Sequence, residues 1–190
     1  LPKSIEIGGC ERATWIDGLS VEDPGELTIA FEPERAGAIS PFRTNTALVS
    51  IELDRRYYWG DLHGQSKETV GSGSAEEYFA FARDLAGLDF AGHQGNDFQI
   101  TGAFWRHLQQ LTRQMTDSDR FVTFPGYEWS GNTALGGDRN VLFLHEGERI
   151  HRSSHALVED PDYDTDCTHV TDLFSALRGR QAMLIPHVGG

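Results

Sequence analysis

The sequence contains little cysteine and no long apolar run. Its two cysteines, Cys10 and Cys167, lie far apart and form no Cys-x-x-Cys pair, so neither a disulfide framework nor a thiolate zinc cluster is indicated. No apolar stretch approaches the ~20 residues that a membrane-spanning helix requires, and there is no internal repeat. We therefore expect no membrane partner.

Positive charge is also scarce. Lys and Arg total 16 against 29 for Asp and Glu, which gives a net charge of −13. Because a nucleic-acid backbone is bound by local positive charge, this composition argues against nucleic acid as a partner. It leaves room for a small-molecule substrate, which could be phosphorylated and held by a few local cations. The oligomeric state and the localisation are left open.

The length and the two ends suggest a piece of a longer protein. The 190 residues suffice for one ordinary domain but fall short of the ~250 residues of a typical α/β barrel. The chain begins at Leu1 rather than at Met and stops at Gly190, directly after an apolar run. We interpret both ends as internal to a longer chain, so a removed signal peptide would leave no trace.

Residues 1–55 differ in pattern from the rest. Two runs of alternating apolar and polar residues, 26–31 and 47–53, are separated by turn-rich pieces with Gly and Pro. This period of two is typical of short β-strands. We expect a small β-rich segment over 1–55, followed by a second domain over 56–190.

Strands alternate with helices in the second domain. Ser74 and Glu77 form a capping-box pattern that opens a helix, and Gly87 is suited to end it. A second helix is expected after Thr101, and a third from Thr171 to Gly179. The expected strands cover 57–62, 88–92, 121–124, 140–144 and 182–185. This alternation predicts an α/β fold with a largely parallel sheet, either a barrel or an open doubly wound sheet, with a polar insertion over 146–166.

Each of the five predicted strands is followed by a histidine or a glutamate. In parallel α/β folds, functional side chains gather at the carboxyl ends of the strands. Imidazole and carboxylate together suit zinc, manganese or iron. We therefore predict a divalent transition-metal site, with candidate ligands His63, Gln65, His93, Glu128, His145 and His187.

Other residues near these positions are weaker candidates. Asp97 is predicted to be catalytic, although a metal ligand or a helix-entry residue fits the position as well. Arg139 is the best placed of three cations, with Lys67 and Arg106, to hold a phosphate, and a surface charge is the alternative for each. Histidines elsewhere are expected to lie on the surface: His107, His151, His155 and His169.

Several of these motifs resemble those of the polymerase and histidinol phosphatase (PHP) superfamily, in particular a branch described only as a domain of unknown function. The resemblance rests on the segments 60–66, 82–84, 88–90, 126–129 and 186–187. It implies a distorted seven-stranded (β/α) barrel, here incomplete at its carboxyl end, with two or three metal ions and phosphoesterase activity. His63 opens the family's His-x-His motif, and Glu128 matches its bridging carboxylate. His93, His145 and His187 match its later histidines.

The sequence departs from the family pattern at three points, one of which is the acidic ligand that usually follows the first motif, for which Glu68 is the only close candidate. Gln65 replaces the second histidine of His-x-His, and the final Asp-x-His motif is absent. The leading prediction is a metal-dependent hydrolase, most simply a phosphoesterase that uses a metal-bound hydroxide. The alternatives are an amide, ester or lactone hydrolase at the same site, a degenerate barrel that binds metal or ligand without turnover, and a structural domain.

Overall fold

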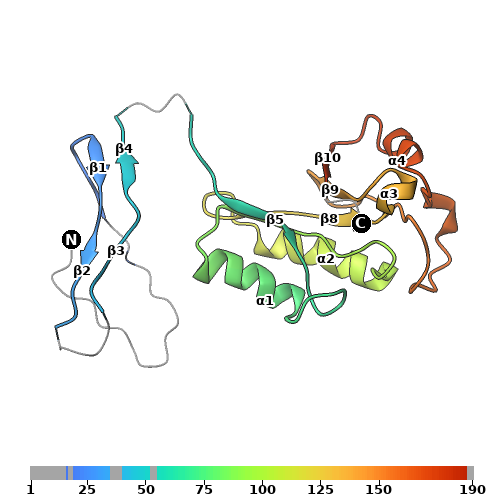
Figure 1. The fold of residues 1–190 in the computed structure, drawn as a ribbon, viewed down its shortest axis with the longest axis horizontal. Helices are drawn as coiled ribbons and strands as arrows, with labels where there is room; N and C mark the ends of the chain where they lie inside the picture. Colours follow the sequence, from blue (N-terminus) through green and yellow to red (C-terminus); the bar gives the residue numbers. More distant parts are fainter. Residues whose placement is uncertain (1–15, 17–18, 35–39, 52–54, 188–190) are drawn as a thin grey trace. The chain divides into compact units, whose positions relative to one another are not determined.

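The chain divides into two compact units, Leu1–Tyr57 and Tyr58–Gly190 (Figure 1). The computed structural model describes residue 16 and residues 19–34, 40–51 and 55–187. Cys10, the last residues of the predicted run 47–53 and the three residues 188–190 lie outside this range. Each unit is described separately.

The first unit consists of two antiparallel strand pairs. β1 (Gly25–Leu27) pairs with β4 (Ala47–Val49), and β2 (Ala30–Phe31) pairs with β3 (Phe42–Arg43). The predicted run 26–31 is thus divided between two strands. The rings of Phe31 and Phe42 stack with centroids 4.7 Å apart, but none of the described residues of this unit is buried.

The second unit begins with a parallel sheet. Its strands are β5 (Gly60–Gly64), β6 (Phe90–His93) and β7 (Val122–Phe124), in the order β5-β6-β7. α1 (Ala75–Ala80) and a π-helical turn (Phe81–Leu85) connect β5 to β6, and α2 (Gly102–Met115) connects β6 to β7. The two helices lie side by side in Figure 1 and contact each other.

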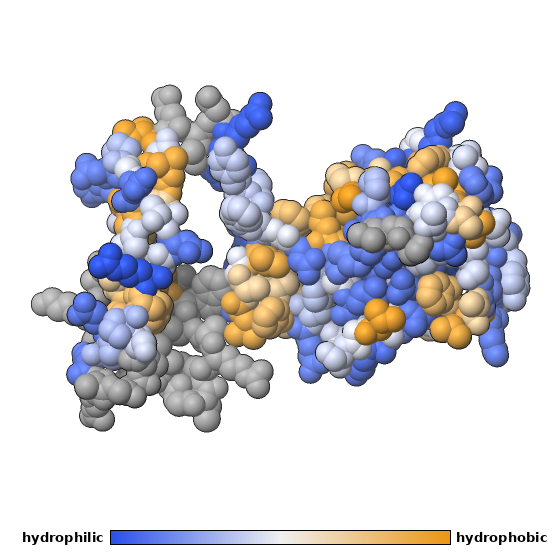
Figure 2. Space-filling view, viewed as in Figure 1, coloured by the Kyte–Doolittle hydropathy of each residue, from blue (hydrophilic) through white to orange (hydrophobic). Residues whose placement is uncertain are grey.

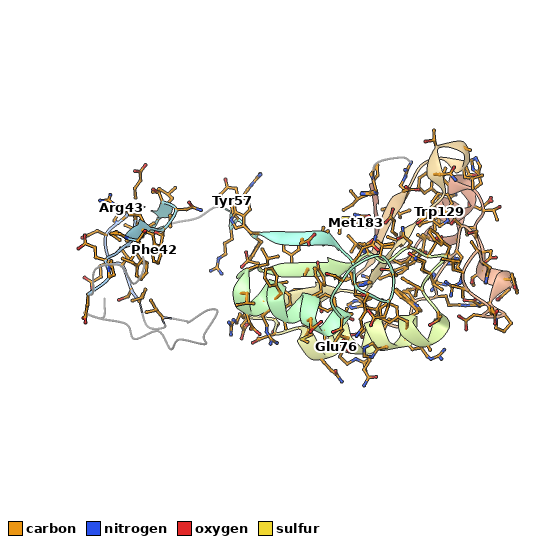
Figure 3. All side chains as sticks on the ribbon, turned by 60° about the horizontal axis from the view of Figure 1, so that its bottom comes forward. Phe42, Arg43, Tyr57, Glu76, Trp129 and Met183 are labelled. Atoms are coloured by element: carbon orange, nitrogen blue, oxygen red, sulfur yellow. The ribbon has the colours of Figure 1, made fainter. Side chains whose placement is uncertain are left out.

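The predicted helix signals in this region are confirmed. Ser74 and Glu77 form a complete capping box at the start of α1, and Gly87 follows the helical segment with φ +64°. The Thr101 side chain caps α2. The face of α2 that carries Trp105, Leu108 and Leu111 is buried in the core, and the side chains drawn in Figure 3 fill the space between helices and strands.

A second sheet has a different topology. β8 (Gly126–Trp129), β9 (Arg139–Phe143) and β10 (Ala182–Pro186) pair in the order β10-β9-β8, and both pairings are antiparallel. α3 (Asn132–Leu135) lies between β8 and β9. A 3-10 turn (Tyr163–Thr165) and α4 (Val170–Ala176) precede β10. The N-cap of α4 is His169 rather than the predicted Thr171.

The predicted (β/α)7 barrel is wrong. In the described part of the chain the strands form small sheets of two or three members, none of which closes on itself. Only β5, β6 and β7 are linked by helices into parallel pairs. Pro125 alone separates β7 from β8, so the motif 126–129, expected to follow a strand, is itself a strand whose four residues are all buried. β9 runs antiparallel to both β8 and β10, so the second sheet is antiparallel where a parallel sheet was predicted.

Part of the predicted polar insertion is buried against the rest of the unit. The Arg152 side chain is completely buried and donates to the main-chain carbonyls of Asp97 and Ile100 and to the carboxylate of Asp162. The side chain of His155, expected on the surface, is only 9% exposed and pairs with Asp166. The face of the second unit that Figure 2 shows is mostly polar, with separate hydrophobic areas. No helix among the described residues is long and apolar enough to cross a membrane.

Candidate metal centre

Three of the predicted ligands lie together in the second unit. His63 is in β5, Glu128 is in β8, and His187 follows β10. One ligand atom of each lies within 4.8 Å of the ligand atoms of the other two. We call these three residues the histidine–glutamate cluster.

The strand directions explain why these residues meet. β8 and β10 both run antiparallel to β9, so their carboxyl ends lie at the same edge of the second sheet. A parallel bridge between Asn96, just beyond β6, and Glu128 places β8 beside the extension of β6. β5 runs parallel to β6, so His63 reaches the same edge.

The ligand atoms in the cluster face one another without a hydrogen bond. His63 Nε2 lies 3.7 Å from Glu128 Oε2, and His187 Nδ1 lies 3.3 Å from Glu128 Oε1. The two imidazoles stack with centroids 4.0 Å apart and planes inclined by 16°. His187 Nδ1 is buried and has no hydrogen-bond partner among the residues that the structure describes.

Glu128 is held by amide donors. Its Oε2 accepts hydrogen bonds from Gln65 Nε2 at 3.3 Å and from Asn96 Nδ2 at 3.1 Å. The residue is 4% exposed. Burial raises the pKa of the Glu128 carboxyl, while protonated imidazoles at His63 and His187 would lower it. A cation beside this carboxylate would offset the cost of burying its charge.

The donor set fits a single divalent ion. Two imidazole nitrogens and one carboxylate form the three-ligand set of several catalytic zinc sites and of non-haem iron sites. Ligand bonds of about 2.1 Å in tetrahedral geometry separate neighbouring donor atoms by roughly 3.4 Å. His187 Nδ1 lies 3.3 Å from Oε1 of Glu128 and His63 Nε2 lies 3.7 Å from Oε2. Each separation is close to this value, but the two involve different oxygens, and one ligand atom of each residue lies within 4.8 Å of the other two. A metal ion binds the lone pair of an unprotonated ring nitrogen, and Nδ1 of His187 is the ring nitrogen that faces Glu128.

His93 lies apart from the cluster and is a core residue. Its Nδ1 accepts from the Gly95 main-chain N–H at 3.2 Å, and its Nε2 lies 2.8 Å from Ser66 Oγ. Since Nδ1 is an acceptor, the neutral ring carries its proton on Nε2 and donates it to Ser66. Burial lowers the pKa of His93 to about 4. Both ring nitrogens are thus occupied within the protein.

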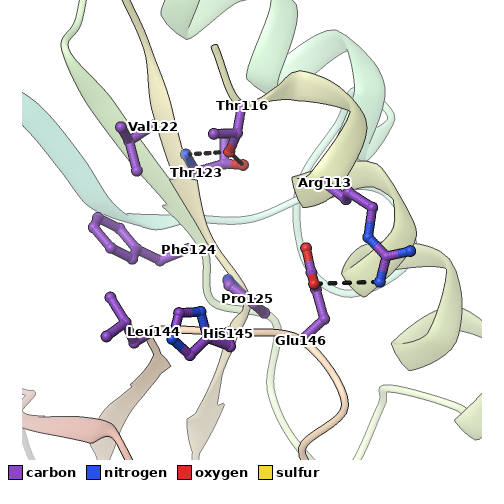
Figure 4. Close-up of a pocket in the computed structure, with 9 residues that line it drawn as sticks. All are labelled: Arg113, Thr116, Val122, Thr123, Phe124, Pro125, Leu144, His145 and Glu146. Atoms are coloured by element: carbon purple, nitrogen blue, oxygen red, sulfur yellow. Dashed lines mark hydrogen bonds and ion pairs between the residues drawn. The ribbon is translucent and has the colours of Figure 1, made fainter. Parts of the chain in front are cut away.

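His145 lies at the opposite end of the sheet. Because β9 is antiparallel to its neighbours, the start of this strand, not its end, lies beside Glu128. His145 is exposed and lines a separate hollow with Arg113, Thr116 and Glu146, in which Arg113 and Glu146 form an ion pair (Figure 4). The structure therefore does not bring His145 to the cluster.

The remaining candidates lie near the cluster, but their side chains have other partners. Gln65 turns its amide nitrogen toward Glu128, and its carbonyl oxygen accepts from Thr69. The Asp97 carboxylate accepts from the main-chain N–H and the hydroxyl of Ser153, and burial raises its pKa to about 7. The Arg139 guanidinium donates to the carbonyls of Asp138 and Gly136.

Two residues beside the cluster were not predicted. Asn96 binds Glu128, and Asn140 lies opposite Glu128 on β9 with its Oδ1 2.9 Å from His63 Nδ1. A neutral amide side chain is not a typical metal ligand, so a search for His, Asp and Glu does not find it. Asn140 also begins a predicted strand, and only the end of that strand was expected at the site. Knowledge that β9 is antiparallel would have pointed to its first residues rather than its last.

Comparison with known proteins gives no functional assignment. The chain is 29% identical over 99 residues to an uncharacterised protein of Chlamydia pneumoniae, a match that covers 51% of this chain and 16% of that protein. It is 26% identical over 97 residues to an uncharacterised protein of Chlamydia trachomatis serovar D, covering 50% of this chain and 16% of the relative. The match thus spans about a sixth of the length of these curated relatives.

No protein-family model and no solved structure matches the chain. The similarity to the PHP superfamily therefore remains a prediction from short motifs. The case for function rests on the geometry of His63, Glu128 and His187.

Proposed function

We propose that the histidine–glutamate cluster binds a divalent transition-metal ion and that the protein is a metal-dependent hydrolase. The observation that carries the proposal is the convergence of two imidazole nitrogens on the buried Glu128 carboxylate, at 3.3 and 3.7 Å from its two oxygens. Acceptors that face each other in a buried site repel unless a proton or a metal ion lies between them. Zinc, manganese and iron all suit this set of donors.

The neighbouring side chains would orient this centre. Gln65 and Asn96 both donate to Oε2 of Glu128, which fixes the carboxylate plane and leaves Oε1 beside His187. A bound metal ion would lower the pKa of a coordinated water toward neutrality and offset the negative charge that develops on a substrate oxygen. The site thus has the components for hydrolysis of a small molecule, with a phosphoester as the leading substrate class.

A second candidate is a hydrolase for amides, carboxylic esters or lactones. The observation in its favour is that the Arg139 guanidinium already donates to the carbonyls of Asp138 and Gly136. To grip a phosphate, Arg139 would have to release or share these bonds. A neutral carbonyl substrate needs no such cation, and the metal chemistry would be the same.

Metal content tests the centre first. Purified protein is reconstituted with zinc, manganese or iron, desalted and analysed by plasma mass spectrometry. We expect about one ion per chain in the wild type, loss of it in the His63→Ala/Glu128→Ala double variant, and retention in a His145→Ala control. Wild-type protein that retains no metal would overturn the proposal.

Substrate panels then separate the candidates. Turnover of phosphoesters that disappears in the double variant supports the leading proposal, and turnover of esters or amides alone supports the second candidate. Bound metal without turnover of either panel would leave a metal-binding centre and contradict the hydrolase.

A further inference from the structure

Asn140 connects the two sheets beside the cluster. It lies in the buried part of β9, directly across from Glu128 in the antiparallel register, and is 6% exposed. Its amide nitrogen donates to the main-chain carbonyl of Leu62 at 3.2 Å, and its Oδ1 lies 2.9 Å from His63 Nδ1. One side chain of the second sheet thus contacts two consecutive residues of β5.

These two contacts determine which atom of His63 carries the proton. The Leu62 carbonyl can only accept, so the NH2 group of Asn140 must face it and the Oδ1 atom must face His63. Oδ1 can only accept, so Nδ1 of His63 must be the donor. In the neutral imidazole the second nitrogen, Nε2, is then unprotonated. Nε2 is the atom that lies 3.7 Å from the Glu128 carboxylate.

We propose that Asn140 is a positioning residue that holds His63 in the tautomer and ring orientation required of a metal ligand. The inference rests on the proposed metal centre and names the residue that prepares it. Ligating histidines commonly donate their other N–H to a carbonyl or carboxylate acceptor, which fixes the ring. A second contact restrains the main chain of the same residue, because Asp61 Oδ1 accepts from the His63 N–H at 2.8 Å.

The tautomer of His63 is tested on metal-free wild-type protein. Long-range ¹H–¹⁵N correlation spectra at about pH 8, where an unperturbed imidazole is neutral, distinguish the two protonation sites. The His63 signals are assigned by their loss in His63→Gln. A proton on Nδ1 is the expected result, and a proton on Nε2 would overturn the inference. This measurement requires neither a bound metal nor an Asn140 variant.

The effect on metal binding is tested with a matched pair of variants. Asn140→Leu removes both the donor and the acceptor, whereas Asn140→Asp removes the donor to Leu62 and keeps an oxygen for His63. The Zn²⁺ dissociation constant is measured by competition with a chromophoric chelator, and circular dichroism checks the fold. We expect binding to weaken by about 10- to 100-fold in the Leu variant and to stay at or above wild-type affinity in the Asp variant.

The outcomes separate this inference from the proposed function. Equal Zn²⁺ affinity in Asn140→Leu and wild type, or equal weakening in both variants, would overturn the positioning role, since both variants lack the donor to Leu62 and the Asp variant alone keeps an acceptor, now charged, for His63. Wild-type protein that binds no Zn²⁺ would overturn the metal centre itself. In that case the tautomer measurement still decides whether Asn140 orients His63.

Discussion

The second unit contains two clusters of largely buried polar side chains. They differ in whether each polar atom has a hydrogen-bond partner within the protein. In the first, which we call the arginine clamp, Arg152, Asp97, Ser153 and Asp162 join the segment after β9 to the segment after β6. Arg152 donates to main-chain carbonyls and to Asp162, and Ser153 donates to both oxygens of Asp97. Each of these donors meets an acceptor.

The histidine–glutamate cluster has the opposite arrangement. His63 and His187 direct ring nitrogens at a buried carboxylate, and within the described part of the chain the Nδ1 of His187 has no hydrogen-bond partner. Burial alone therefore does not distinguish a functional polar group from a structural one. What sets the cluster apart is that two imidazoles converge on one buried carboxylate, because such a set of facing acceptors calls for a proton or an ion between them.

The largest expected effect is loss of stability when the arginine clamp is broken. Arg152→Met leaves the carbonyls of Asp97 and Ile100 and the carboxylate of Asp162 without their donor. We expect a loss of about 3 kcal/mol in the free energy of unfolding. This is the lower end of the range for removing one partner of a buried ion pair, and we choose it because Asp162 is partly exposed. Urea denaturation followed by circular dichroism measures it.

The matched control is a surface arginine with similar partners. Arg149 makes two hydrogen bonds to Asp164, and both side chains are more than half exposed. We expect Arg149→Met to change stability little, because exposed ion pairs contribute weakly. Equal losses in the two variants would contradict the contrast between a buried clamp and a surface pair.

The second prediction concerns the cluster, where removing charge has the opposite consequence. Glu128→Gln keeps one oxygen for Gln65 or Asn96 and replaces the other with an amide that can donate to an imidazole. We expect the metal-free variant to be at least as stable as the wild type. Zn²⁺ at 100 times its dissociation constant is expected to stabilise the wild type by about 2.7 kcal/mol and the variant not at all. Thermal unfolding with and without Zn²⁺ measures both.

A clear loss of stability in metal-free Glu128→Gln would show that the carboxylate is satisfied without a metal, as the groups of the arginine clamp are. Equal stabilisation of both proteins by Zn²⁺ would place the ion elsewhere.

The third prediction is a pH dependence within the clamp. Burial raises the pKa of Asp97 to about 7, above the value of about 3.9 in an unfolded chain. Between these values the folded protein retains a proton that the unfolded chain has released, so stability decreases as pH rises. The decrease from pH 5 to pH 7 attributable to this group is about 2 kcal/mol. Urea denaturation of wild type and Asp97→Asn at several pH values measures this decrease. It is the difference between the two proteins in how the free energy of unfolding changes with pH.

Parallel slopes in wild type and Asp97→Asn would show that the carboxylate is already ionised in the folded protein. Other titrating groups, including Glu128 with its raised pKa, are common to both proteins and cancel in this comparison.

Local signals in the sequence were more reliable than strand direction. The capping box of Ser74 and Glu77, a helix after Thr101 and a helix end at Gly87 were predicted and are present, whereas the predicted cap Thr171 is replaced by His169. These features depend on a few neighbouring residues. Whether β9 runs parallel or antiparallel depends on how distant segments pack, which apolar periodicity does not encode. The wrong direction for β9 led to the wrong fold class.

Strand direction and packing also determine which of the candidate ligands lie close to one another. His63, Glu128 and His187 were predicted from their positions at strand ends, and the structure places them within reach of one ion. His93 occupies a similar sequence position, but both of its ring nitrogens are bonded in the core. Asn140 was overlooked because it begins a strand whose end was expected at the site.

The smallest expected effect tests the antiparallel direction of β9 directly. His187 and His145 both follow or end a strand of the second sheet, but only His187 lies beside Glu128. We expect His187→Ala to abolish the stabilisation by Zn²⁺, whereas His145→Ala changes neither the free energy of Zn²⁺ binding nor the free energy of unfolding by more than about 0.5 kcal/mol, as is usual for surface substitutions. Calorimetric titration of both variants with Zn²⁺ provides the measurement. If His145→Ala weakened binding as much as His187→Ala did, then His145 would contact the ion, and β9 could not have the antiparallel direction that places its start beside Glu128. Unchanged binding in His145→Ala together with loss in His187→Ala would show that of two histidines with the same sequence signal, strand direction selects the one that binds.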